Sequence, residues 1–274
     1  MTGVILPLSF FGFVCYNSSI SAIQGRLGVL KKLFDKDEVW FAVIWIIVYV
    51  AGFSNADSLS EVIGIPKLLT ILFGMIMVLF LGGFIRKYQL SEYFGLCQVT
   101  GHRGQFLWFI PLIVISSVNL WNGVTLNASF PETILYIISM CFVGFLEEVI
   151  FRGLLFKGMC RSNVTIAILV SSLTFGMGHI VNLLLGEPLF DTMLQLVYAS
   201  AIGFCYTAVF HVSGSILPCI LSHAFVNSTS IFAVEPTEEM HILITIVQTL
   251  LSVGYGIWLL GNHRPVSGEE ERSI

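Results

Sequence analysis

The sequence has few charged residues. Asp, Glu, Lys and Arg make up 11% of the 274 residues, against about 25% in soluble globular domains. Hydrophobic residues make up 56%, which excludes a water-soluble globule and a disordered chain. The net charge is −4, and without a basic patch we expect no nucleic-acid partner. A membrane protein that crosses the bilayer several times is the class that remains.

Cysteine pairs are also missing. None of the six cysteines forms a Cys-x-x-Cys pair, and most lie within apolar stretches. Neither a disulfide framework nor a zinc ribbon follows from this pattern. We interpret them as small residues of the core.

Eight apolar segments approach the length of about 20 residues that a helix needs to cross a bilayer. They lie at about residues 39–54, 67–85, 105–121, 133–152, 163–184, 192–210, 215–234 and 241–260. The shorter stretch 4–16 lacks the basic start of a signal peptide; a ninth span reaching about residue 23 is favoured over an interfacial helix or an uncleaved anchor. We therefore predict an all-α, polytopic transmembrane helical bundle of about eight spans, with a possible N-terminal ninth.

Lysine and arginine gather in alternate connections. They occur in the loops 24–38, 86–104 and 153–162 and in the tail after residue 260, whereas the intervening loops have almost none. Because basic loops remain in the cytoplasm, we expect these loops and the C-terminus to be cytoplasmic. An integral multi-pass protein of this kind would lie in the plasma membrane of a bacterium or in the endoplasmic reticulum of a eukaryote.

Three charged residues lie inside the predicted spans and away from their ends: Glu147, Glu148 and Arg152. Each costs about 2.5–3.5 kcal/mol at the centre of a membrane helix, so such residues are functional by default. Glu148 and Arg152 are four residues apart, which predicts an ion pair on one helix face. Glu147 points about 100° away, which leaves it free to face another helix.

Histidines occur in two later spans. If the chain folds back near residue 161, Glu147 lies opposite about residue 175, which places His179 about one helical turn deeper. His223 lies in a further span, with Asn227 one turn after it. We interpret the other histidines as interfacial or solvated, since they lie in loops or at helix ends; these are His102, His211, His241 and His263.

These residues form three ordered motifs. Glu147–Arg152 reads EExxxR, Phe175–His179 reads FxxxH, and His223–Asn227 reads HxxxN. In this order, on successive apolar helices, they resemble the motifs of the CPBP family, which contains the type II CAAX prenyl endopeptidases and the bacteriocin-processing Abi proteins. The resemblance covers about residues 130–235. It implies that the first Glu and first His activate a water and that the last His and Asn form an oxyanion hole.

The residue chemistry suits these roles. Glu147 in a low-dielectric cavity would be a general base of raised basicity, and His179 could hold the same water and pass its proton to the leaving amine. His223 and Asn227 could donate hydrogen bonds to the oxyanion. We predict these four as the catalytic residues.

The predicted supporting residues are Glu148, Arg152 and Phe175. The Glu148–Arg152 pair would fix its helix face, and Phe175 would pack so as to position His179. We also expect Gly176 and Gly178 to permit close approach of helices.

A metal site is less well supported. His179, His223 and one glutamate could form a His₂Glu zinc site, and the family is often labelled as metalloproteases. However, the chain has no HExxH motif, and the family chemistry can run without an ion. No cofactor is predicted with certainty, and zinc stays a possibility.

We therefore expect an intramembrane endopeptidase acting on a prenylated CAAX or leader-peptide substrate, with a lipidated or membrane-inserted peptide and the lipid bilayer as partners. The alternative is a non-catalytic immunity or scaffold protein, or a proton-coupled transporter that uses the same Glu/His cluster.

Four regions of the chain are expected. They are 1–38, an N-terminal hydrophobic segment and basic loop; 39–130, peripheral transmembrane helices; 131–235, the catalytic core; and 236–274, the last helix and tail.

Overall fold

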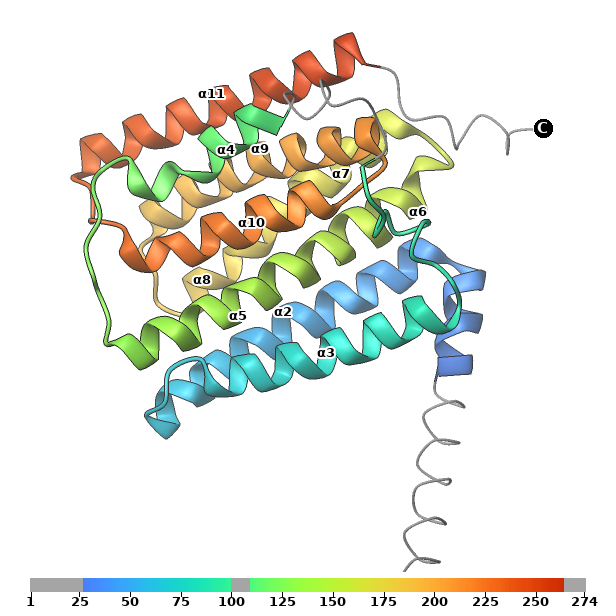
Figure 1. Ribbon diagram of the computed structural model, residues 1–274, viewed down its shortest axis with the longest axis horizontal. Coiled ribbons are helices and arrows are strands. Elements are labelled where there is room, and N and C mark those ends of the chain that lie inside the picture. The colour runs from blue at the N-terminus through green and yellow to red at the C-terminus, as the bar shows by residue number, and fades with distance from the viewer. Residues whose placement is uncertain (1–26, 100–108, 264–274) are drawn as a thin grey trace, which may run out of the picture.

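Long apolar stretches form helices because a backbone inside a bilayer must satisfy its own hydrogen bonds. A computed structural model describes residues 27–99 and 109–263, and within these ranges the fold is helical with no β-strand (Figure 1). The predicted N-terminal span at 4–23 and the basic tail after residue 263 lie outside the described residues. The all-α fold class is confirmed.

Six helical segments of the described chain are long and apolar enough to cross a membrane. They are α2 (Glu38–Ile63), α3 (Leu68–Lys87), Phe130–Cys160, Val164–Leu184, α9 (Leu189–Ser213) and α11 (Glu238–Asn262). Phe130–Cys160 joins α5 (Phe130–Glu148), the π-helix η3 (Val149–Phe156) and α6 (Lys157–Cys160). Val164–Leu184 joins α7 (Val164–Met177), the 3₁₀ turn η4 (Gly178–Ile180) and α8 (Val181–Leu184). The protein is therefore an integral membrane protein.

Two of the eight predicted spans are shorter than expected. The stretch 105–121 contains α4 (Ile110–Ser116) and the 3₁₀ turn η2 (Val118–Leu120), while its residues before 109 are not described. The stretch 215–234 contains α10 (Leu217–Thr229) and the 3₁₀ turn η5 (Ser230–Phe232). A side-chain hydrogen bond joins the two segments near their ends: Asn119 of η2 donates to the carbonyl of Val226 in α10 at 2.6 Å.

The connections separate into two ends of the bundle. At one end Arg161 pairs with Glu38 at 3.0 Å, and the amide of Ile216 donates to the carbonyl of Gly95 at 2.9 Å. At the other end the amide of Thr125 donates to the carbonyl of Phe232 at 2.9 Å. The described basic loops thus share one end of the bundle, hereafter the basic end, as their alternation along the sequence indicates. The side of the membrane on which it lies stays a prediction.

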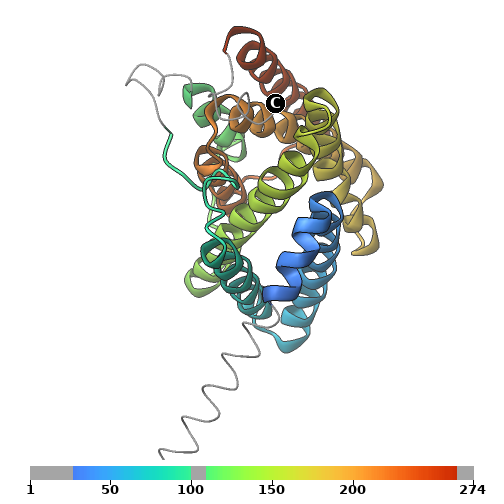
Figure 2. The ribbon, with the colours of Figure 1, turned by 90° about the vertical axis from the view of Figure 1, so that its right-hand side faces the viewer.

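The segment α5–η3–α6 forms the centre of the bundle. Figures 1 and 2 show α2 and α3 on one side of it and α9, α10 and α11 on the other. Every residue of η3 is buried, whereas large apolar side chains of α2, α3, α7 and α11 are exposed, as expected for a surface in contact with lipid. Arg152 lies in this fully buried stretch, and Glu147 and Glu148 directly precede it at the end of α5.

Candidate active site

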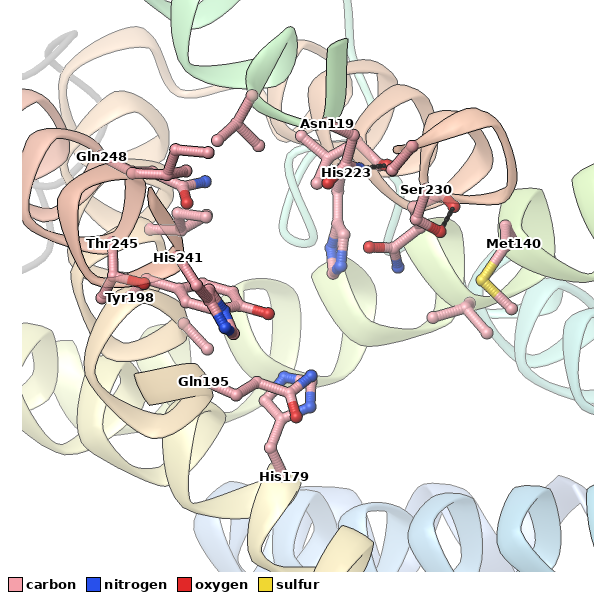
Figure 3. Close-up of a pocket in the computed structure, with 18 of the residues that line it drawn as sticks. Asn119, Met140, His179, Gln195, Tyr198, His223, Ser230, His241, Thr245 and Gln248 are labelled. Carbon is pink, nitrogen blue, oxygen red and sulfur yellow. Dashed lines mark hydrogen bonds between the residues drawn. The ribbon is translucent and has the colours of Figure 1, made fainter. Parts of the chain in front are cut away.

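A cavity of about 430 Å³ lies between α5, α7, α9, α10 and α11 (Figure 3). The four predicted catalytic residues, Glu147, His179, His223 and Asn227, all line it. Its volume lies within the range of about 300–1,000 Å³ that is typical of ligand pockets. The structure thus brings side chains from three separate segments of the sequence to one cavity.

Glu147 has one engaged oxygen and one free oxygen. Its Oε1 accepts a hydrogen bond from the hydroxyl of Tyr49 on α2 at 2.5 Å. Its Oε2 lies 3.5 Å from Nε2 of His223 and has no hydrogen-bond partner among the described residues. The carboxylate is therefore oriented through Oε1, while Oε2 can accept a proton or bind a water.

The predicted ion pair of Glu148 and Arg152 is present in the core. Glu148 Oε1 accepts from Nη1 of Arg152 at 3.0 Å, and neither side chain is exposed. Arg152 also donates from Nη2 to the carbonyl of Gly203 at 3.1 Å, and its guanidinium lies 4.3 Å from the centre of the Phe175 ring. Such cation–π contacts stabilise a desolvated charge.

His223 lies between the two glutamates. Its Nδ1 is 2.8 Å from Glu148 Oε1, and its Nε2 faces Glu147. Adjacent residues of one helix therefore contact opposite nitrogens of the same imidazole. Glu147 was expected to face a different helix from Glu148. Its contact with Tyr49 of α2 meets this expectation, but both glutamates also face His223 of α10.

A π-helix begins directly after the glutamate pair. The residues of η3 form the wider i→i+5 turn, a feature that is rare and often found at functional sites. The predicted pairing of Glu148 with Arg152 relied on regular α-helical spacing, which Val149–Phe156 does not have. The Glu148–Arg152 pair still forms because Glu148 is the last residue of α5 and Arg152 lies in the first turn of η3.

Small residues bring the helices of the site together. A Cβ atom on Gly144 would lie 2.7 Å from the backbone nitrogen of Ala224, so α5 and α10 are in close backbone contact one turn from Glu147 and directly beside His223. A Cβ atom on Gly176 would lie 2.0 Å from Ser200 Oγ, which confirms close approach of α7 and α9 at this glycine. The same prediction for Gly178 is wrong, since no atom lies within 4 Å of the position of its Cβ.

Phe175 connects the charged cluster to His179. Its ring centre lies 5.9 Å from that of His179 and 5.5 Å from that of His223, both nearly perpendicular. His179 itself follows α7 in the 3₁₀ turn η4 and reaches the cavity from there. The predicted supporting residue thus packs between both histidines and Arg152.

Sequence reasoning missed several polar residues of the cavity. His241, interpreted as interfacial or solvated, lines it, and its Nδ1 is 3.3 Å from Asp191 Oδ1. The start of α11 packs on that of α9, which carries this histidine towards the cavity. Neutral polar residues line it as well: Asn119, Asn122, Gln195, Tyr198, Thr245 and Gln248.

The arrangement does not fit the zinc site that the sequence left open. Both nitrogens of His223 face carboxylates. Across the described ranges, no three His, Cys, Asp or Glu side chains come together in a way that could bind a metal ion.

The cavity extends away from the basic end. Its lining includes Asn122, Val234 and Pro236, which lie in the connections of the opposite end. The predicted catalytic residues therefore share this cavity with the connections of the end opposite the basic end.

Residues 129–229 match the family model described as type II CAAX prenyl endopeptidase, Rce1-like. This segment contains all three motifs, and the resemblance to the CPBP/CAAX protease family is confirmed. No match was found among curated proteins. The match supports a membrane protease of this family in general.

Proposed function

We propose that the protein is an intramembrane endopeptidase that hydrolyses a peptide bond in a membrane-associated substrate, using a water activated by Glu147 and His179. The observation that carries the proposal is the free Oε2 of Glu147 in a cavity shared with His179, His223 and Asn227. The family match makes a prenylated CAAX peptide the first substrate to test. A membrane-associated leader peptide is the second.

In the proposed reaction Glu147 Oε2 removes a proton from the water as its oxygen attacks the carbonyl carbon. The tetrahedral intermediate then carries a negative oxygen, which accepts hydrogen bonds from the Asn227 amide and from a ring N–H of His223. His179 relays the proton taken up by Glu147 to the leaving nitrogen as the C–N bond breaks. The products are an amine and a carboxylic acid, which loses its proton to give the carboxylate. Oxyanion donors of this kind contribute about 3–4 kcal/mol each to transition-state stabilisation in proteases.

The buried pair supports this chemistry without contacting the substrate. The contact between Glu148 and Nδ1 fixes the His223 ring so that Nε2 points to Glu147. Tyr49 restrains the other oxygen of Glu147. The general base and one oxyanion donor are thus each positioned by a partner outside the cavity, which is how preorganised sites are built.

The test uses the purified full chain in lipid nanodiscs and a fluorescent, farnesylated Cys-aliphatic-aliphatic-Met peptide, with an unlipidated hydrophobic leader peptide as the second arm. Glu147→Gln should lower kcat by about 10²–10⁴-fold, the usual contribution of a general base, because an amide cannot accept the proton. The matched control on the same helix is Glu132→Gln, which retains the capping box at the start of α5. Cleavage at the wild-type rate by Glu147→Gln would disprove the proposal.

A further inference from the structure

The α11 wall of the cavity has buried polar atoms without partners. Thr245 and Gln248 are 4% and 3% exposed, and both line the cavity that contains Glu147. Thr245 Oγ1 and Gln248 Nε2 have no hydrogen-bond partner among the described residues. Buried polar atoms are nearly always paired, so these two groups face the cavity with hydrogen-bonding capacity that a bound ligand can use.

Three other amide side chains that line the cavity already bind protein groups. Asn119 donates to the carbonyl of Val226 at 2.6 Å, and Asn122 donates to that of Val234 at 3.2 Å. Gln195 Oε1 accepts from Asn182 at 2.7 Å. The amide nitrogen of Gln248, which Figure 3 shows directed from α11 into the cavity, differs from these in being available.

The chemistry of the lining selects a neutral ligand. Among the described residues that line the cavity there is no lysine or arginine, and the carboxylate of Glu147 is present. A carboxylate or phosphate group would therefore be repelled by Glu147, with no lysine or arginine in the lining to compensate for the repulsion. An amide N–H and a hydroxyl match the neutral carbonyl and N–H groups of a peptide main chain.

We propose that Gln248 and Thr245 form a main-chain binding subsite for the peptide substrate. Gln248 Nε2 donates to a substrate carbonyl, and the Thr245 hydroxyl bonds to a neighbouring main-chain group. Figure 3 shows the two residues across the cavity from His223, so the peptide would lie between α11 and the catalytic residues. This subsite rests on the proposed endopeptidase function. It comes from a helix outside the matched segment 129–229.

The main test separates binding from chemistry. Gln248→Leu and Thr245→Val should each raise KM for the farnesylated peptide by about 3- to 10-fold, the effect of one lost neutral hydrogen bond. Their kcat should change less than about 2-fold, because binding that is uniform between ground and transition state affects KM alone. The matched control is Ser252→Ala, a fully buried residue of α11 that also has an unpartnered hydroxyl but does not line the cavity. An unchanged KM in both variants, or an equal change in Ser252→Ala, would overturn the subsite.

A substrate series identifies the bond itself. Analogues of the same peptide, each with one main-chain amide replaced by an ester, present a weaker carbonyl acceptor. One analogue should bind less tightly than the parent to wild type and equally tightly to Gln248→Leu. Equal discrimination by both proteins would contradict the proposed hydrogen bond.

Binding in the Glu147→Gln background distinguishes this proposal from the activity. Fluorescence anisotropy with the same labelled peptide needs no turnover. If wild type cleaves nothing but Gln248→Leu still weakens binding, the endopeptidase proposal fails and the subsite stands. If cleavage occurs and Gln248→Leu leaves binding unchanged, the subsite alone is disproved.

Discussion

The matched segment 129–229 and the helices that flank it contribute different chemistry to the site around Glu147 and His223. Within the segment, the charged groups bind one another: Glu148 contacts both Arg152 and His223. The flanking helices contribute neutral groups, the hydroxyl of Tyr49 from α2 and the polar side chains of α11. The comparison teaches that the motifs contain the charged groups of the site, while the flanking helices add a hydrogen bond to Glu147 and polar side chains in the cavity wall.

The largest effect should come from breaking the charge network of the matched segment. Arg152→Ala leaves Glu148 as a buried carboxylate without its cation, a change that costs about 3–5 kcal/mol of stability. The unfolding temperature in detergent should therefore fall together with the activity. Arg86→Ala, an exposed arginine at the end of α3, is the control. An Arg152→Ala protein as stable as this control would show that the network has no structural role.

A smaller effect should come from the contribution of α2. Tyr49→Phe removes the hydrogen bond to Glu147 and retains the ring that packs 4.6 Å from that of Phe53. Hydrogen bonds to charged groups contribute about 1.5–3 kcal/mol, so kcat should fall about 10-fold or more while KM and the unfolding temperature change little.

The control for Tyr49→Phe is Tyr93→Phe, which removes a tyrosine–glutamate hydrogen bond, to Glu38, at the basic end. An equal loss of kcat in both variants would mean that Tyr49 has no specific role at Glu147. A loss of stability without loss of kcat would place Tyr49 among the packing residues only.

The charged residues were predictable because charge is rare and costly inside a membrane helix. Glu147, Glu148 and Arg152 are conspicuous in an apolar stretch, and helical spacing indicated the pairing of Glu148 with Arg152. The bundle was predictable for the same reason, since long apolar runs have few structural alternatives. Both conclusions depend only on local sequence.

The remaining features depend on tertiary contacts. Tyr49 and Gln248 are neutral residues of apolar helices, and nothing local distinguishes them from polar side chains that bind their own backbone, as Ser172 does with the carbonyl of Ile168. The close contact of α5 with α10 at Gly144 can be recognised only when the position of α10 is known. The contact between Asn119 and Val226, which joins η2 to α10, cannot be read from hydropathy.

The central claim is that Glu147 and His179 act on one water, and a double-mutant cycle on kcat tests it most directly. The variants are Glu147→Gln, His179→Ala and the double variant, assayed with the farnesylated peptide. Residues that act as a unit have effects on kcat that do not add. We therefore expect each single change to lower kcat by about 10²–10⁴-fold. The double variant should be no slower than the slower of the two single variants. Losses that multiply in the double variant would contradict a shared water.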